Sequence, residues 1–112
     1  MREPKGRAQS GKSPGMDEKV RLFFDGLSDA HRIRMVDMLL EREMNVSAIC
    51  GHFPLKQPSV SHHLKALKKG GALKARKSGK EVYYSVNRKY VSSIMTYYFA
   101  RWGFMVKDID DD

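Results

Sequence analysis

Proline and glycine divide the middle of this chain into short pieces, and their positions constrain the fold more than any other feature. Pro54 lacks the N–H that a continuing helix needs, so it marks a turn. Pro58 suits the first turn of a new helix, and Gly70-Gly71 supplies a left-handed C-cap that ends it. The pattern therefore predicts a helix over residues 57–69, directly after a sharp turn.

Two helices are predicted before that turn. Apolar residues recur at helical spacing over residues 17–25: Val20, Phe23 and Phe24. Gly26 ends this helix, and Ser28 is predicted to cap the next one, with Asp29 in its first turn. The apolar face of the second helix is predicted to carry Ile33, Val36, Leu39 and Leu40. Two methionines lie on another side of it: Met35 and Met38.

Asn45 is predicted to cap a short helix that ends near Gly51, with three inward residues: Val46, Ile49 and Cys50. Two runs of β-forming residues, 73–77 and 81–86, flank a Gly-containing turn and predict a β-hairpin. A last helix is predicted from Arg88 to about Met105. Two helices at a sharp turn, followed by a basic hairpin, indicate a mainly α (α+β) winged helix-turn-helix with about five helices and a two-stranded wing.

The net charge of +8 is concentrated on that predicted helix and hairpin. Residues 56–80 contain no acidic residue but eight basic ones: Lys56, Lys65, Lys68, Lys69, Lys74, Arg76, Lys77 and Lys80. Val60, Leu64 and Leu67 form a narrow apolar stripe, so the rest of the helix is expected to be open to solvent. A solvated, solubilising face is the alternative, but a basic block within a folded segment favours a surface that meets a polyanion.

Short polar groups and cations on an open helix suit base edges and phosphates. The residues predicted to read bases are Gln57, Ser59, Ser61 and His62. Those predicted to hold phosphates are Lys56, Lys65, Lys68 and Lys69. Lys77 and Lys80 at the hairpin tip are predicted to contact the DNA backbone. His63 lies beside the apolar stripe and is expected to pack there.

Three motifs, in order, resemble the ArsR-type repressor family. Residues 27–34 (LSDAHRIR) resemble its opening motif, residues 57–67 (QPSVSHHLKAL) its recognition helix, and residues 77–86 (KSGKEVYYSV) its wing. The resemblance covers roughly residues 20–87. It implies a homodimeric winged-helix transcriptional regulator that binds palindromic operators, usually as a repressor released by an inducer.

The chain departs from this family at the sensor. Asn45 and Ser47 stand where metal-sensing relatives carry two cysteines, and the last helix lacks the histidines of the other common metal site. We therefore expect no metal and no cofactor, and the inducer is not specified. Cys50 and His52 are expected to be a small apolar residue and a turn residue. A thiol- or ligand-responsive regulator that uses Cys50, with His52 or His31, remains an alternative.

The last helix carries a Met and aromatic stripe that a chain of 112 residues has little interior to cover. We expect it to form a twofold dimer surface with the first helix. The predicted interface residues are Val20, Phe23, Phe24, Val91, Ile94, Met95, Tyr98, Trp102 and Met105. A small-molecule pocket is the alternative use of this stripe.

The chain is thus predicted to comprise a disordered basic arm (1–15), a winged-helix DNA-binding and dimerisation domain (16–107) and an acidic tail (108–112). We expect a cytoplasmic homodimer that binds double-stranded DNA, with no membrane span and no enzymatic activity. Neither the adjacent Ser61-His62 nor any glycine loop forms a catalytic or phosphate-binding motif. The other function class is a protein–protein module that holds an acidic partner on a winged-helix scaffold.

Overall fold

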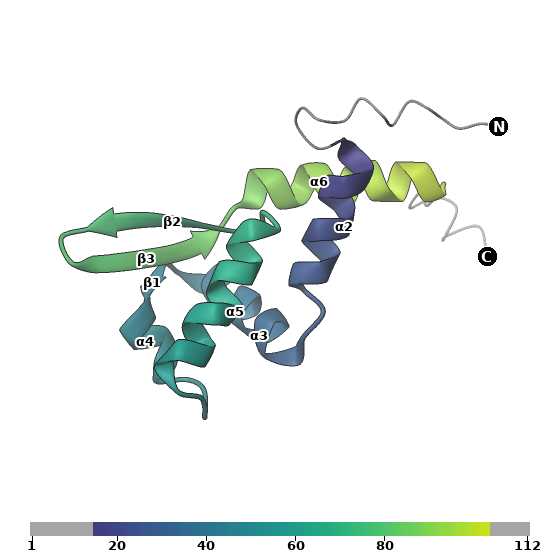
Figure 1. Ribbon diagram of the computed structural model, residues 1–112. Coiled ribbons are helices and arrows are strands. Elements are labelled where there is room, and N and C mark those ends of the chain that lie inside the picture. Colours follow the sequence, from purple (N-terminus) through teal and green to yellow (C-terminus); the bar gives the residue numbers. More distant parts are fainter. Residues whose placement is uncertain (1–14, 104–112) are drawn as a thin grey trace.

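The computed structural model describes residues 15–103. Residues 1–14 of the predicted arm, the predicted acidic tail and Met105 lie outside this range. The elements, in chain order, are α2 (Met16–Gly26), α3 (Ala30–Glu41), β1 (Met44–Asn45), α4 (Val46–Cys50), α5 (Gln57–Lys69), β2 (Leu73–Ser78), β3 (Glu81–Val86) and α6 (Arg88–Trp102) (Figure 1). No helix within the described range has the length and apolar character needed to cross a membrane.

Helix α5 is the central packing element of the fold. It contacts α2, α3, α4 and β2, and its stripe of Val60, Leu64 and Leu67 is fully buried. The hairpin β2–β3 and helix α6 extend from this helical body in opposite directions (Figure 1). The architecture confirms the predicted winged helix-turn-helix, with the bounds of α5 and of the hairpin close to those predicted.

The cap of α3 lies one residue later than predicted. The Asp29 carboxylate accepts hydrogen bonds from the backbone N–H groups of His31 (2.8 Å) and Arg32 (3.3 Å). Ser28 instead donates its hydroxyl to the carbonyl of Asp25, at 2.6 Å, so it completes the end of α2. The prediction of Ser28 as the N-cap was therefore wrong, because the carboxylate reaches two orphan donors of the new helix.

The buried face of α3 also differs from the prediction. Met35 is completely buried and Leu39 is 3% exposed, whereas Ile33 is 49% and Leu40 is 39% exposed. Val36 and Met38 are partly buried against the core. Ile33 and Leu40 do share a face with Val36, but α5 and the sheet meet the helix along Met35 and Leu39.

The sheet has three strands in the order β1-β3-β2, one more than the predicted hairpin. Strand β1 has only two residues, which pair antiparallel with β3 as Met44↔Tyr84 and Asn45↔Tyr83. A two-residue strand is too short to show alternation in a sequence, which explains why it was missed. Its pairing fastens the base of the wing to the segment between α3 and α4.

Helices α2 and α5 approach closely through two buried glycines. A Cβ on Gly26 would lie 3.1 Å from the carbonyl oxygen of Ala66, and one on Gly70 would lie 2.6 Å from that of Leu22. Gly70 keeps a right-handed conformation, and Gly71 (φ 92°) supplies the left-handed turn predicted for this pair. The backbone of α2 therefore rests directly against the C-terminal half of α5.

Helix α6 ends earlier than predicted. Its last residue is Trp102, and Gly103 adopts a left-handed conformation at φ 74°, with its N–H bonded to the carbonyl of Ala100. The apolar periodicity continues to Met105, but a left-handed glycine is a strong helix stop.

The substitution Gly70→Ala should lower the free energy of unfolding by about 1–3 kcal/mol, because the new methyl group must displace the backbone of α2. Urea unfolding followed by circular dichroism measures this change. The control is Gly51→Ala, whose Cβ would make an ordinary 3.4 Å contact. Equal stabilities of the two variants would contradict the close packing.

Candidate nucleic-acid interface

The residues predicted to contact DNA all lie on accessible surface. Nine are exposed and Ser61 is half-buried; the exposed ones are Lys56, Gln57, Ser59, His62, Lys65, Lys68, Lys69, Lys77 and Lys80. They occupy the side of α5 away from its buried stripe, and the tip of the wing. No residue within 15–103 forms an ion pair with any of these lysines. The surface is therefore strongly basic and its cations are available to an external anion.

The N-terminus of α5 is also open. Lys56 occupies the N-cap position without a side-chain hydrogen bond, and Pro58 lies in the first turn. The backbone N–H groups of Ser59 and Val60 bond back to the carbonyl of Lys56 at 3.0 and 3.1 Å. The partial positive charge at this helix end adds to that of the side chains.

An ion pair that the sequence analysis missed braces the wing. Arg76 on β2 donates two hydrogen bonds of 2.8 Å to the carboxylate of Glu43, which directly precedes β1. Its guanidinium also lies over the ring of Tyr83, 4.8 Å from the centroid. The hydrogen bonds from Arg76 hold the pKa of Glu43 below its usual value. Arg76 belongs to the basic block of residues 56–80, but its charge is already paired with Glu43 within the protein.

His63 and Arg32 form a polar junction between α5 and the start of α3. Arg32 Nε donates to His63 Nδ1 at 2.9 Å, and the ring of His31 lies 5.8 Å from that of His63. His63 is half-buried, in agreement with the prediction that it packs, whereas His62 is exposed. Burial lowers the pKa of His63, and the charges of Arg32, His31 and His62 lower it further, against the opposing effect of Asp29.

The capping carboxylate of Asp29 also has a shifted pKa. Burial alone would raise it, but the hydrogen bonds from the backbone N–H groups of Arg32 and His31 outweigh burial and lower it. Asp29 therefore stays ionised near neutral pH, where it stabilises the first turn of α3.

The residues at the candidate metal positions have other roles in this fold. Asn45 Oδ1 accepts the N–H of Ala48 at 2.8 Å, which confirms it as the cap of α4, and Ser47 is exposed. Cys50 is a free, half-buried thiol, and His52 lies exposed in the following turn. The described part of the chain contains no group of three or more His, Cys, Asp or Glu side chains placed to hold a metal ion.

The predicted dimer surface is only partly available. Phe23 and Ile94 are 1% and 0% exposed inside the protomer, so their assignment to an interface was wrong: they fill the space between α2, α6 and the core. Trp102 is 61% exposed. The remaining described members are half-buried: Val20, Phe24, Val91, Met95 and Tyr98.

Of these, Phe24, Val91 and Met95 line an apolar groove, which lies beside an aromatic stack. The rings of Phe24 and Tyr98 are 5.0 Å apart, and those of Tyr98 and Trp102 are 5.3 Å apart. The groove has a volume of about 470 Å³ and is bordered by α2, α3 and α6, with exposed Ile33 at its edge. Sequence reasoning missed Ile33 here because it assigned the residue to the core.

Comparison with known proteins agrees with this geometry. Residues 29–74 match the family model described as bacterial regulatory protein, arsR family. The transcriptional repressor SdpR of Bacillus subtilis is 36% identical over 64 residues, which cover 57% of this chain and 71% of SdpR. The HTH-type transcriptional regulator KmtR of Mycobacterium tuberculosis is 31% identical over 91 residues, which cover 79% of this chain and 70% of KmtR.

The chain belongs to the ArsR family. It is accordingly a transcriptional regulator by family. Among solved structures, a winged helix-turn-helix domain from Mycobacterium bovis superposes with a TM-score of 0.66 at 24% identity, over 84% of this chain and 88% of that domain. That domain is described as homodimeric and DNA-binding. The superposition confirms the fold of this ArsR-family protein.

Because the pKa of His63 is depressed from 6.5, the folded protein binds its proton less readily than the unfolded chain does. The free energy of unfolding should therefore fall as the pH drops through about 6.5 toward the folded-state pKa, and level off below it. Urea unfolding at a series of pH values measures the slope.

The variant His63→Gln should show a smaller loss of stability over the same pH interval, since glutamine does not titrate. Its side-chain oxygen can still accept from Arg32, so the fold is preserved. His52→Gln, at an exposed turn, is the control and should keep the full slope. An unchanged slope in His63→Gln would show that other groups cause the pH dependence.

Proposed function

We propose that this ArsR-family regulator is a homodimeric, sequence-specific DNA-binding repressor that acts in the cytoplasm on a palindromic operator. The observation that carries the proposal is the two-sided character of α5. Its apolar stripe is completely buried, while its opposite side presents polar groups and lysines that form no ion pair with any residue in 15–103. A helix anchored on one side and open on the other fits the major groove of DNA.

The roles of individual residues follow from their positions on this surface. Gln57 suits bidentate contact with adenine, and the side chains of Ser59, Ser61 and His62 are proposed to read neighbouring bases. Lys56, Lys65, Lys68 and Lys69 are proposed to neutralise phosphates along the groove. Lys77 and Lys80 at the tip of the wing are proposed to contact the DNA backbone next to the major groove. The Arg76–Glu43 ion pair supports this role because it holds the hairpin in place.

The homodimer is supported by the groove between α2, α3 and α6 and by the aromatic stack beside it. Within residues 15–103 the groove is lined mainly by apolar side chains, and an apolar groove on a small protein suits contact with a second subunit. Twofold pairing through α2 and α6 would place two copies of α5 about 34 Å apart, one turn of DNA.

Selection of bound duplexes from a random pool, at about physiological salt, tests the proposal, because non-specific electrostatic binding is weak there. The expected result is an inverted repeat whose half-sites are about one helical turn apart. If a folded, dimeric sample selects no motif, the proposal of sequence-specific DNA binding fails, and the alternative of a module that holds an acidic protein partner is favoured.

Two substitutions on α5 should affect DNA binding in different ways. Lys65→Ala should weaken binding to all sequences and reduce the slope of log affinity against log salt by about one unit. Gln57→Ala should reduce discrimination at one base pair by about 1–3 kcal/mol. Competition assays with operator variants at several salt concentrations measure both effects. An unchanged base preference in Gln57→Ala would remove it from the reading residues.

A further inference from the structure

A hollow of about 330 Å³ lies between α2 and α5, next to the surface proposed to read DNA. We call it the α2–α5 hollow. Its lining residues come from three helices and the residue after α5: Leu22, Asp25, Gly26, Arg32, His62, Lys65, Ala66, Lys69 and Gly70. The close approach at Gly26 and Gly70 holds its two walls together, so the hollow is preformed.

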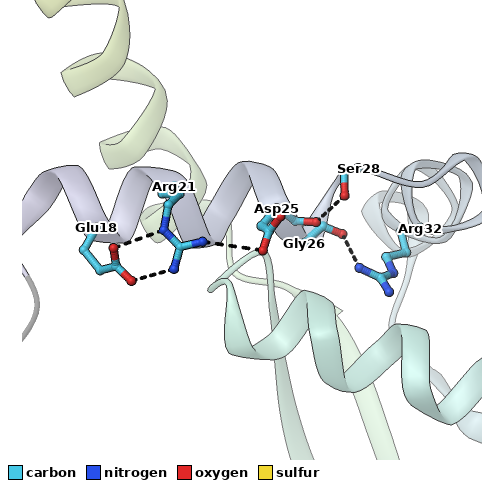
Figure 2. Close-up of polar contacts among 6 residues, drawn as sticks. All are labelled: Glu18, Arg21, Asp25, Gly26, Ser28 and Arg32. Atoms are coloured by element: carbon cyan, nitrogen blue, oxygen red, sulfur yellow. Dashed lines mark hydrogen bonds and ion pairs between the residues drawn. The ribbon is translucent and has the colours of Figure 1, made fainter.

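The α2–α5 hollow carries an excess of positive charge. Arg32, Lys65 and Lys69 contribute three cations, whereas Asp25 contributes the one carboxylate. Asp25 forms an ion pair with Arg21, which does not line the hollow: Arg21 Nη1 lies 3.7 Å from Asp25 Oδ2 (Figure 2). The carboxylate therefore does little to neutralise the three cations that face the hollow.

Arg32 is fixed in its position at the edge of the hollow. Its Nη1 approaches the carbonyl oxygen of Gly26 at 3.5 Å (Figure 2), and its Nε donates to His63 Nδ1 at 2.9 Å. Its Nη2 has no hydrogen-bond acceptor among residues 15–103. A guanidinium that is already held in place loses little side-chain entropy when it binds an oxyanion.

The hollow also lies where a DNA strand would pass. His62, Lys65 and Lys69 recur at helical spacing along the exposed side of α5, and α2 and Arg32 border that side. An α-helix in the major groove has a phosphate backbone along each of its flanks. The backbone on the α2 flank would therefore run over the α2–α5 hollow.

We propose that the α2–α5 hollow holds one DNA backbone phosphate in each half-site, with Arg32 and Lys69 as contact residues and His63 as the residue that positions Arg32. This inference rests on the proposed DNA-binding function. It adds Arg32, from outside α5 and the wing, to the DNA-contacting residues. His62, which is proposed to read bases, also borders this hollow.

The test uses the full chain and the operator duplex found by selection, with single phosphates replaced in turn by uncharged methylphosphonates. For the unmodified protein, a methylphosphonate at one position per half-site, on the α2 flank, should lower the affinity for the operator roughly tenfold. This loss is expected when charged hydrogen bonds to that phosphate are removed. Lys69→Gln should bind the unmodified operator roughly tenfold more weakly. It should lose little further affinity when that same phosphate is neutralised.

Lys68→Gln is the matched control, because Lys68 is the neighbouring exposed cation on α5 but does not line the hollow. It should weaken binding yet remain sensitive to the methylphosphonate at the α2-flank position. Arg32→Gln should behave as Lys69→Gln does, and Lys69→Gln keeps the test valid if Arg32→Gln fails to fold. If both hollow variants stay as sensitive as Lys68→Gln, the inference is overturned.

A second arm distinguishes DNA phosphate from a free anion. Inorganic phosphate is titrated into the DNA-free protein and followed by NMR shifts of α5. Saturable binding that Lys69→Gln abolishes, together with unchanged operator affinity in that variant, would overturn the DNA assignment. Failure of the unmodified protein to select any motif would instead overturn the proposed function, so the two failures are distinguishable.

Discussion

The burial of Val60, Leu64 and Leu67 is the interaction on which the rest of the structure depends. These three side chains are completely excluded from solvent, and α5, which carries them, contacts α2, α3, α4 and β2. Because the stripe is narrow, the remaining circumference of the helix is left for polar and basic residues. One helix thereby organises the core and presents the candidate interface, which couples the stability of the fold to the orientation of its surface.

The sequence predicts α5 and the wing well because their ends depend on residues with strong local preferences. Proline at the first turn of α5, Gly71 after it and Gly79 in the hairpin each restrict the backbone regardless of tertiary context. Asn45 was identified for the same reason, since its side chain caps α4 locally. The ten candidate DNA contacts are accessible because each is polar or basic, which keeps them out of the core.

The errors concern contacts between distant parts of the chain. Periodicity finds the apolar residues of α3, but it does not say that α5 meets Met35 and Leu39 rather than Ile33 and Leu40. The same ambiguity placed Phe23 and Ile94 on a dimer surface, although they fill the protomer's own core. Strand β1 and the pairs Arg76–Glu43 and Arg32–His63 join segments more than 30 residues apart, so no local pattern indicates them.

The brace at the base of the wing limits how such a regulator can be switched. Because β1 pairs with β3 and Arg76 is bound to Glu43, the hairpin is joined to the same core that holds α5. These contacts restrict changes in the angle between the helix and the wing within each protomer. In the proposed dimer, the remaining adjustable quantity is the relative placement of two rigid halves across α2 and α6. An inducer would therefore act most effectively by binding between the subunits. It would alter the spacing of the two α5 helices without changing the structure of either protomer.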